Sequence, residues 1–163
     1  MVMPLEKVTE LVRCQVEKLA SLLAEAGGNL HHVKLHGALY NQANRDSSLA
    51  AAAIKGISNI SKELKLYALP NGCLAAAGRA AGLTVCGEGF ADRRYREDGS
   101  LMPRTEPGAL ITDVETAVSQ TMQLLSNEEI KTICIHGDGA KAVAMLQAIH
   151  RAMNHLAAET SLP

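Results

Sequence analysis

The sequence predicts an α/β fold in which a parallel sheet is flanked by helices. Short apolar stretches with the length of strands alternate with longer stretches in which apolar residues recur every three or four positions, and the second spacing is typical of amphipathic helices. Repeated strand–helix units make successive strands parallel and cover the sheet with helices. Polar residues follow three of the expected strands, at the edge of a parallel sheet where ligands gather.

The order of the elements follows from where each stretch starts and stops. Glycines end several stretches, and Asp46 or Ser47 and Thr112 or Asp113 can cap the helices that follow them. Ile111 is ambiguous, because it can extend an edge strand or lead into the next helix. We therefore expect, in order, a helix over 5–26, a strand over 30–35, a helix over 46–64, a strand over 66–69, a helix over 73–81, a strand over 83–86, a polar loop over 87–107, a helix over 113–125, a strand over 130–135 and a helix over 139–158.

Length and composition indicate a single globular domain over residues 1–163. Hydrophobic residues make up 47% of the chain, which is typical of a folded protein. A net charge of −1, with three Tyr, one Phe and no Trp, argues against nucleic acid as a partner, since that requires a basic surface or stacking rings. No apolar run is long enough to cross a membrane, and no signal peptide is visible. We therefore expect a cytoplasmic protein whose four scattered cysteines are reduced.

The first polar cluster lies at the end of the strand expected over 30–35. Lys34 and His36 alternate with apolar residues, so they are expected to share one face of this strand. In an active site, Lys34 would supply positive charge to an anion and His36 would transfer a proton near neutral pH. Asn41, shortly after Gly37, could orient a substrate carbonyl. The alternatives are a solvated lysine, a histidine bonded to a nearby loop and an asparagine that caps a turn.

The second polar cluster begins at Glu88 and brings two acids and two arginines into one short segment. Glu88 ends an apolar strand, where partial burial would suit a general acid or base. Asp92 could orient Arg93, and the guanidinium of Arg93 could bind a carboxylate through two hydrogen bonds. On the residues alone we favour a surface group of ion pairs, which adds little to stability. The long loop that follows could close over a site as a lid.

The third polar cluster is His136 and Asp138, where a strand ends, glycines free the backbone and a helix begins. Backbone N–H groups at a helix start attract anions, and these two side chains could hold a water molecule or a proton. Asp138 could instead cap the helix. The spacing is not that of a nucleotide phosphate loop. Because no short His spacing typical of a metal site occurs, we assign no metal ligands from the sequence.

The chain contains the segments VKLHGALYN over 33–41, GEGFADRRY over 87–95 and CIHGD over 134–138. These three segments resemble the LamB/YcsF family and occur in the family's order. The resemblance runs from about Leu11 to about Leu156, with departures at Leu35 and after Asp138, where the family usually has proline. Family members are longer, and the Asp-Leu-Asn, His-Ala-Gly-Asp and Gly-x-His-Pro segments of their N-terminal part do not occur here. The chain therefore resembles the C-terminal two-thirds of a family member.

The resemblance implies an incomplete version of the seven-stranded β/α barrel of glycoside hydrolases and deacetylases. It also implies a component of ATP-dependent 5-oxoprolinase, which opens the cyclic amide 5-oxoproline to glutamate. Partner subunits B and C would bind ATP and phosphorylate the lactam, and this chain would hydrolyse the activated product. The resemblance favours the interpretation of the three polar clusters as parts of an active site. Its catalytic residues would be Lys34, His36, Glu88, Asp92, His136 and Asp138, and its substrate-binding residues would be Asn41, Arg93 and Arg104.

Two other interpretations stay open. One is a different amide or carbohydrate hydrolase related to the deacetylases, and the other is a truncated, non-catalytic binding or scaffold protein. An incomplete barrel would expose a strand edge and an apolar helix face, so we expect a homo-oligomer. We also expect the chain alone to convert 5-oxoproline more slowly than a full-length family member. Dependence on a metal is left open.

Overall fold

The computed structural model describes residues 3–160 of the chain, which forms two compact units, one up to Gly87 and one from Glu88. The sheet has four strands in the order β1-β2-β3-β4, and helices flank it, as the sequence predicts. None of the helices in the described part of the chain is long and apolar enough to cross a membrane. The prediction of a single domain stays a prediction.

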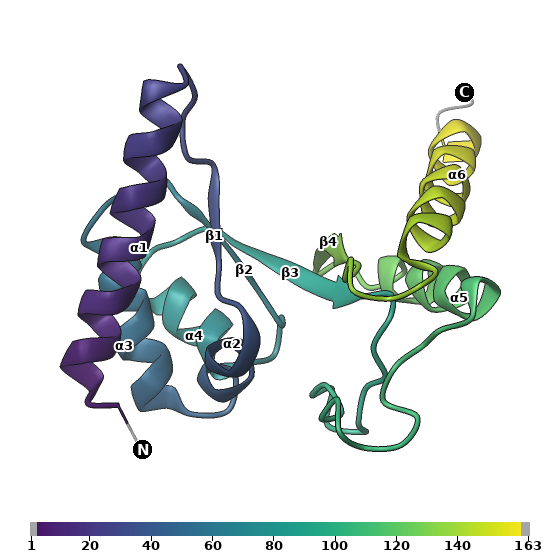
Figure 1. The fold of residues 1–163 in the computed structure, drawn as a ribbon, viewed down its shortest axis with the longest axis horizontal. Coiled ribbons are helices and arrows are strands. Elements are labelled where there is room, and N and C mark those ends of the chain that lie inside the picture. Colours follow the sequence, from purple (N-terminus) through teal and green to yellow (C-terminus); the bar gives the residue numbers. More distant parts are fainter. Residues whose placement is uncertain (1–2, 161–163) are drawn as a thin grey trace. The chain divides into compact units, whose positions relative to one another are not determined.

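The first unit is built by close packing of small and aliphatic residues. Strand β1 pairs with β2 and β2 with β3, both in parallel, so that Val33 lies opposite Leu66 and Leu66 opposite Val85. Helix α1 lies along α3 (Figure 1), because Gly56 brings the two backbones close together. The elements of this unit are α1 (Leu5–Glu25), β1 (His32–Lys34), α2 (Gly37–Ala43), α3 (Ser47–Ser58), β2 (Lys65–Ala68), α4 (Cys73–Ala80) and the start of β3 (Val85–Phe90).

The second unit holds the end of β3, a long loop, α5 (Val114–Leu125), β4 (Ile130–Cys134) and α6 (Ala142–Thr160) (Figure 1). Helices α5 and α6 pack against each other. Their core is aliphatic. It consists of Ala91, Ile111, Ala117, Met145 and Ile149. The loop after β3 doubles back on itself through isolated antiparallel bridges, which join Arg93 to Leu110 and Tyr95 to Leu101.

N-cap residues are predicted correctly at two helix starts, and one helix end is misplaced. The side chain of Asp46 caps α3 by accepting from the backbone N–H groups of Ser48 and Leu49, and Asp113 caps α5 in the same way. The helix expected to reach Leu64 ends at Ser58, because the polar residues after it form a turn that leads into β2. Helix α2 was not predicted.

Strand β3 extends to Phe90, beyond the strand expected over 83–86. Gly89 was expected in the polar loop over 87–107, but it lies within the strand and is needed for packing. A Cβ atom there would lie 3.1 Å from the side chains of Ile133 and Leu124. The last helix begins at Ala142, later than expected, because the glycine-containing segment before it forms a turn instead of helix.

Candidate functional site

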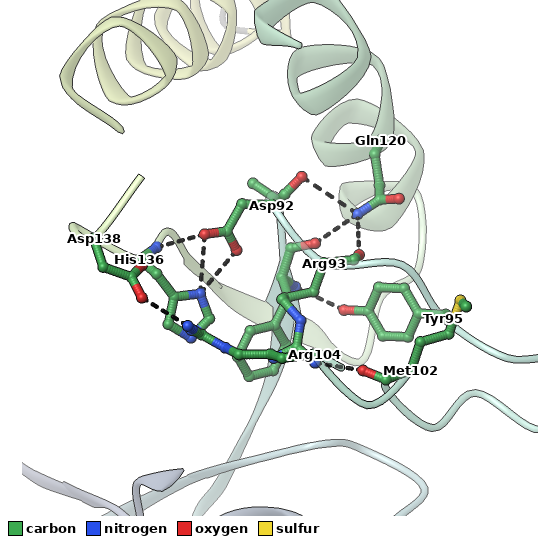
Figure 2. Close-up of polar contacts among 10 residues, drawn as sticks. Asp92, Arg93, Tyr95, Met102, Arg104, Gln120, His136 and Asp138 are labelled. Carbon is green, nitrogen blue, oxygen red and sulfur yellow. Dashed lines mark hydrogen bonds and ion pairs between the residues drawn. The ribbon is translucent and has the colours of Figure 1, made fainter. Parts of the chain in front are cut away.

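The candidate site is centred on a carboxylate–imidazole pair formed by Asp92 and His136. Both oxygens of Asp92 lie 2.9 Å from Nδ1 of His136, and the backbone N–H of His136 donates to Oδ2 of Asp92 at 2.8 Å (Figure 2). A carboxylate only accepts hydrogen bonds, so this arrangement places the proton on Nδ1 and leaves Nε2 for a ligand or water. The carboxylate thus fixes both the orientation and the tautomer of the imidazole.

The ends of two neighbouring strands bring this pair together. Asp92 lies just after the end of β3, and His136 just after the end of β4, the next strand in the sheet order. The backbone N–H of Ala91 donates to the carbonyl of Cys134 at 3.0 Å, which joins the two strand ends. The ring of Phe90 stacks on the imidazole with centroids 5.8 Å apart. Strand pairing therefore sets the position of both catalytic candidates, as expected for a parallel sheet.

Buried polar side chains hold the loop after Asp92 through hydrogen bonds to the backbone. Arg93 is 4% exposed and donates through Nη2 to the carbonyl of Met102. Burial, together with the positive charge of Arg104, lowers the pKa of Arg93. The hydroxyl of Tyr95 accepts from the backbone N–H of Phe90 at 2.7 Å, and burial raises the pKa of Tyr95 to about 12. The first residues of this loop are therefore held in place by hydrogen bonds to the backbone.

An ion pair connects the same loop to the turn after β4. Nη1 of Arg104 lies 2.7 Å from Oδ2 of Asp138, and both side chains are well exposed. The hydrogen bond and the charge of Arg104 lower the pKa of Asp138. Exposed pairs of this kind contribute little to stability, so Arg104 can exchange its partner for another anion at small cost.

A pocket of about 270 Å³ lies among these side chains. Its wall combines polar and apolar side chains, the usual lining of a small-molecule site. The residues that line it are Asp92, Arg104, Leu110, Ile111, Thr112, His136, Asp138, Gly139, Ala140, Lys141, Ala142 and Met145. In the described part of the chain, no group of three or more His, Cys, Asp and Glu side chains is placed to hold a metal ion.

The pocket gathers four of the predicted site residues, Asp92, Arg104, His136 and Asp138. Arg93 lies beside them but directs its guanidinium to the loop backbone. Asp92 was expected to orient Arg93, and it instead holds His136. Asp138 does not cap the last helix, because that helix begins only at Ala142.

The remaining predicted site residues are Lys34, His36, Asn41 and Glu88. Lys34 is at the end of β1, with Nζ 5.9 Å from the centre of the Tyr40 ring. His36 immediately precedes α2 and is exposed. Nδ2 of Asn41 donates to a carbonyl of its own helix. Glu88, in β3, is 2% exposed. A role for these four residues in one site with His136 stays a prediction.

Sequence reasoning missed Gln120, whose side chain donates to the backbone around Asp92. A glutamine in the middle of an amphipathic helix looks like any residue of the solvent face, so no local pattern could have singled it out. Tyr95 is part of the segment over 87–95, but its role as a backbone partner was not predicted either. Both residues act through contacts that only the folded loop creates.

Comparison with known proteins identifies the family. The family model described as LamB/YcsF matches residues 1–161. The chain belongs to the LamB/YcsF family. Among curated LamB/YcsF-like relatives, the A subunit of 5-oxoprolinase from Heliobacterium modesticaldum is 40% identical, over 90% of this chain and 63% of its own length. Its counterpart from Shouchella clausii is 41% identical, over 86% and 60%.

A solved structure supports the same assignment. The crystal structure of the lactam utilization protein from Thermus thermophilus is 32% identical, with a TM-score of 0.87, over 96% of this chain and 67% of that protein. Against the two curated relatives, this LamB/YcsF chain spans only 60% and 63% of their length. The match therefore covers most of this chain but only part of each relative.

Proposed function

We propose that this chain is a component of an ATP-dependent 5-oxoprolinase that hydrolyses an activated lactam. The names of its relatives, which are A subunits of 5-oxoprolinase at about 40% identity, carry the proposal. The pocket beside the Asp92–His136 pair supports it, because a water molecule there would have a base within reach. Opening the five-membered ring of 5-oxoproline to glutamate consumes one water molecule, and release of the phosphate that comes from ATP consumes a second.

The chemistry divides between activation and hydrolysis. A lactam is a poor electrophile, and transfer of a phosphoryl group from ATP to its oxygen makes the carbonyl carbon more electrophilic. After water adds to that carbon, the ring C–N bond breaks and the nitrogen takes up a proton. A second water molecule then hydrolyses the acyl phosphate to glutamate and phosphate. His136 would accept a proton from that water through Nε2, and Asp92 would stabilise the imidazolium that forms. Arg104 would bind the substrate carboxylate in place of Asp138, since a guanidinium forms paired hydrogen bonds with carboxylates.

The other parts of the proposal concern what surrounds this chain. Subunits B and C would bind ATP and phosphorylate the lactam, and the complex would work in the cytoplasm. The four-stranded sheet would correspond to part of a β/α barrel, and a homo-oligomer would cover its edge. Lys34, His36, Asn41 and Glu88 would complete the site.

The test combines purified chain with subunits B and C, ATP, magnesium and 5-oxoproline, and follows glutamate. We expect His136→Ala to lower the rate by about 10²- to 10⁴-fold, the usual contribution of a general base. His150→Ala is the matched control, because His150 is an exposed histidine on α6 outside the pocket lining. Equal rates for the two variants would contradict the role of His136.

Binding gives a second readout, which does not depend on turnover. We expect titration calorimetry to detect 5-oxoproline but not 2-pyrrolidone, which lacks the carboxylate, and Arg104→Ala to abolish that preference. If the unaltered chain shows neither binding nor glutamate formation, the proposed function is wrong. Activity on acetylated sugars instead would point to a deacetylase-like hydrolase.

A further inference from the structure

We propose that Gln120 is the positioning residue that aligns the Asp92–His136 pair. Only the expected effect on turnover rests on the proposed function. The amide nitrogen Nε2 of Gln120 lies 2.7 Å from the carbonyl oxygen of Phe90, 2.8 Å from that of Arg93 and 3.4 Å from that of Ala91. Asp92 is the residue enclosed by these three carbonyls. One side chain of α5 thus holds the backbone on both sides of the catalytic carboxylate (Figure 2).

The three carbonyl oxygens need a donor at this point. Oxygens that converge on one place repel one another, and partly buried acceptors without a donor cost free energy. The amide group of Gln120 supplies two N–H donors. Among neutral side chains, only those of Gln and Asn offer two donors on one nitrogen. Strand β2 does not provide this donor, because its register with β3 ends at Gly87.

Helix α5 is well suited to carry this donor, because it is fixed at both the start and the middle. Asp113 caps its first turn through the backbone N–H of Thr116 at 2.8 Å. Ala117, one turn later, is fully buried in the same core cluster as Ala91. Gln120 therefore projects from a rigid helix toward a segment that packs on that helix.

The orientation of the 90–93 backbone determines where the Asp92 carboxylate lies. Both Asp92 oxygens are 2.9 Å from the imidazole nitrogen, so a small rotation of the peptide groups would lengthen these contacts beyond good hydrogen-bond geometry. Loss of the Gln120 donor would permit that rotation. The imidazole would then lose the acceptor that keeps its proton on Nδ1.

A stabilising role without positioning is the competing explanation, and the tautomer of His136 separates the two. We would measure the ¹⁵N shifts of the histidine rings and the Nδ1 proton signal by NMR, with His136→Gln used to assign the signals among the six histidines. Asp92→Asn is the positive control. Gln123→Met is the matched negative control, because Gln123 is an exposed glutamine on the same helix.

We expect Gln120→Met to lose the Nδ1 proton signal and to shift His136 toward the Nε2–H tautomer, as Asp92→Asn does, while Gln123→Met keeps both. In the reconstituted complex, Gln120→Met should lower kcat and leave KM for 5-oxoproline nearly unchanged. An unchanged His136 tautomer in folded Gln120→Met would overturn the proposal, even if its thermal stability falls.

The isosteric Gln120→Glu decides the question if the Met variant does not fold, because a carboxylate repels the three carbonyls without changing the volume. It should show the same loss of the Nδ1 proton. If neither variant folds, Gln120 serves stability alone and the proposal fails. A shifted tautomer without glutamate formation in the unaltered complex would refute the proposed function and leave the positioning role intact.

Discussion

Each of the two units has an aliphatic core, but the second adds polar side chains that donate to the backbone around the candidate site. In the first unit the fully buried side chains are aliphatic, such as Ile57, Leu66 and Leu74, and α1 approaches α3 where the sequence has glycine. In the second unit, buried or half-buried polar side chains reach to the backbone. Arg93 and Gln120 donate to carbonyls there.

This difference shows where the chain can position chemical groups. Apolar packing is non-directional, so it fixes the distance between elements better than the orientation of a single side chain. Hydrogen bonds are directional, and a network of them can hold a carboxylate against an imidazole. The first unit therefore resembles a scaffold, and the second resembles a site.

The largest effect is expected where the packing of the first unit is tightest. In Gly56→Ala the new Cβ would lie 2.6 Å from the backbone carbonyl of Thr9 and 3.1 Å from Cβ of Val12. Alanine favours a helix over glycine by about 1 kcal/mol, but overpacking against a backbone atom costs about 3 kcal/mol. We expect a net loss of about 2 kcal/mol in the free energy of unfolding, measured by urea titration.

The matched control is Ala51→Ser, an exposed position on the same helix, where only a few tenths of a kcal/mol are expected. If Gly56→Ala were as stable as the control, α1 and α3 would not be in close contact in solution. Tight packing would then no longer distinguish the first unit from the second.

A smaller and pH-dependent effect is expected in the second unit. Tyr95→Phe removes the acceptor of the Phe90 N–H and should destabilise the protein at pH 7 by about 1 kcal/mol. Burial raises the pKa of Tyr95 to about 12, so the folded state favours the neutral phenol. The stability that Tyr95 confers is complete below its unfolded pKa of about 10 and is lost as the pH rises through the folded value.

The measurement is the urea midpoint of both proteins between pH 9 and pH 12, in steps of about half a unit, over the window set by these two pKa values. The stability of the unaltered chain relative to Tyr95→Phe should fall by about 2 kcal/mol across this window, so the variant, which is about 1 kcal/mol less stable at pH 9, becomes the more stable protein near pH 12. A stability difference between the two proteins that does not change with pH would mean that the Tyr95 hydroxyl is solvated. Tyr95 would then not belong to the buried polar network.

The smallest effect is expected at the exposed ion pair between Arg104 and Asp138. Arg104 lowers the pKa of Asp138, so any stabilisation is present above the unfolded pKa of the carboxyl and disappears as the pH falls through the folded value. Because both side chains are exposed, we expect Asp138→Asn to leave the urea midpoint at pH 7 unchanged. A clear drop in stability, abolished by added salt, would show that this pair belongs to the network that holds the loop.

The sequence predicts much of the framework. Strand and helix periodicity placed the four strands, and N-cap chemistry identified Asp46 and Asp113 at the starts of α3 and α5. Glycine was misleading, because its role depends on tertiary contacts. Gly89 lies in the interior of β3 and makes room for neighbouring side chains, although its sequence context looks like a turn.

The site was predictable to the extent that it lies at strand ends. Asp92 and His136 each follow a strand, and neighbouring parallel strands bring them together. Asp138 was named from its place after a strand end and Arg104 through the family resemblance, but their pairing across 34 positions was not foreseen. The role of Gln120 could not be predicted, because a side chain that donates to carbonyls distant in the sequence leaves no periodic pattern.

The scarcity of aromatic rings has an optical consequence. The chain has no Trp and three Tyr, so its ultraviolet fluorescence comes from tyrosine alone. The hydroxyl of Tyr95 is bonded to the backbone of Phe90, whose ring stacks on His136. With Tyr40 and Tyr67 replaced by phenylalanine, the one remaining fluorophore would lie within the network around the candidate site, and ligand binding could be followed without an attached dye.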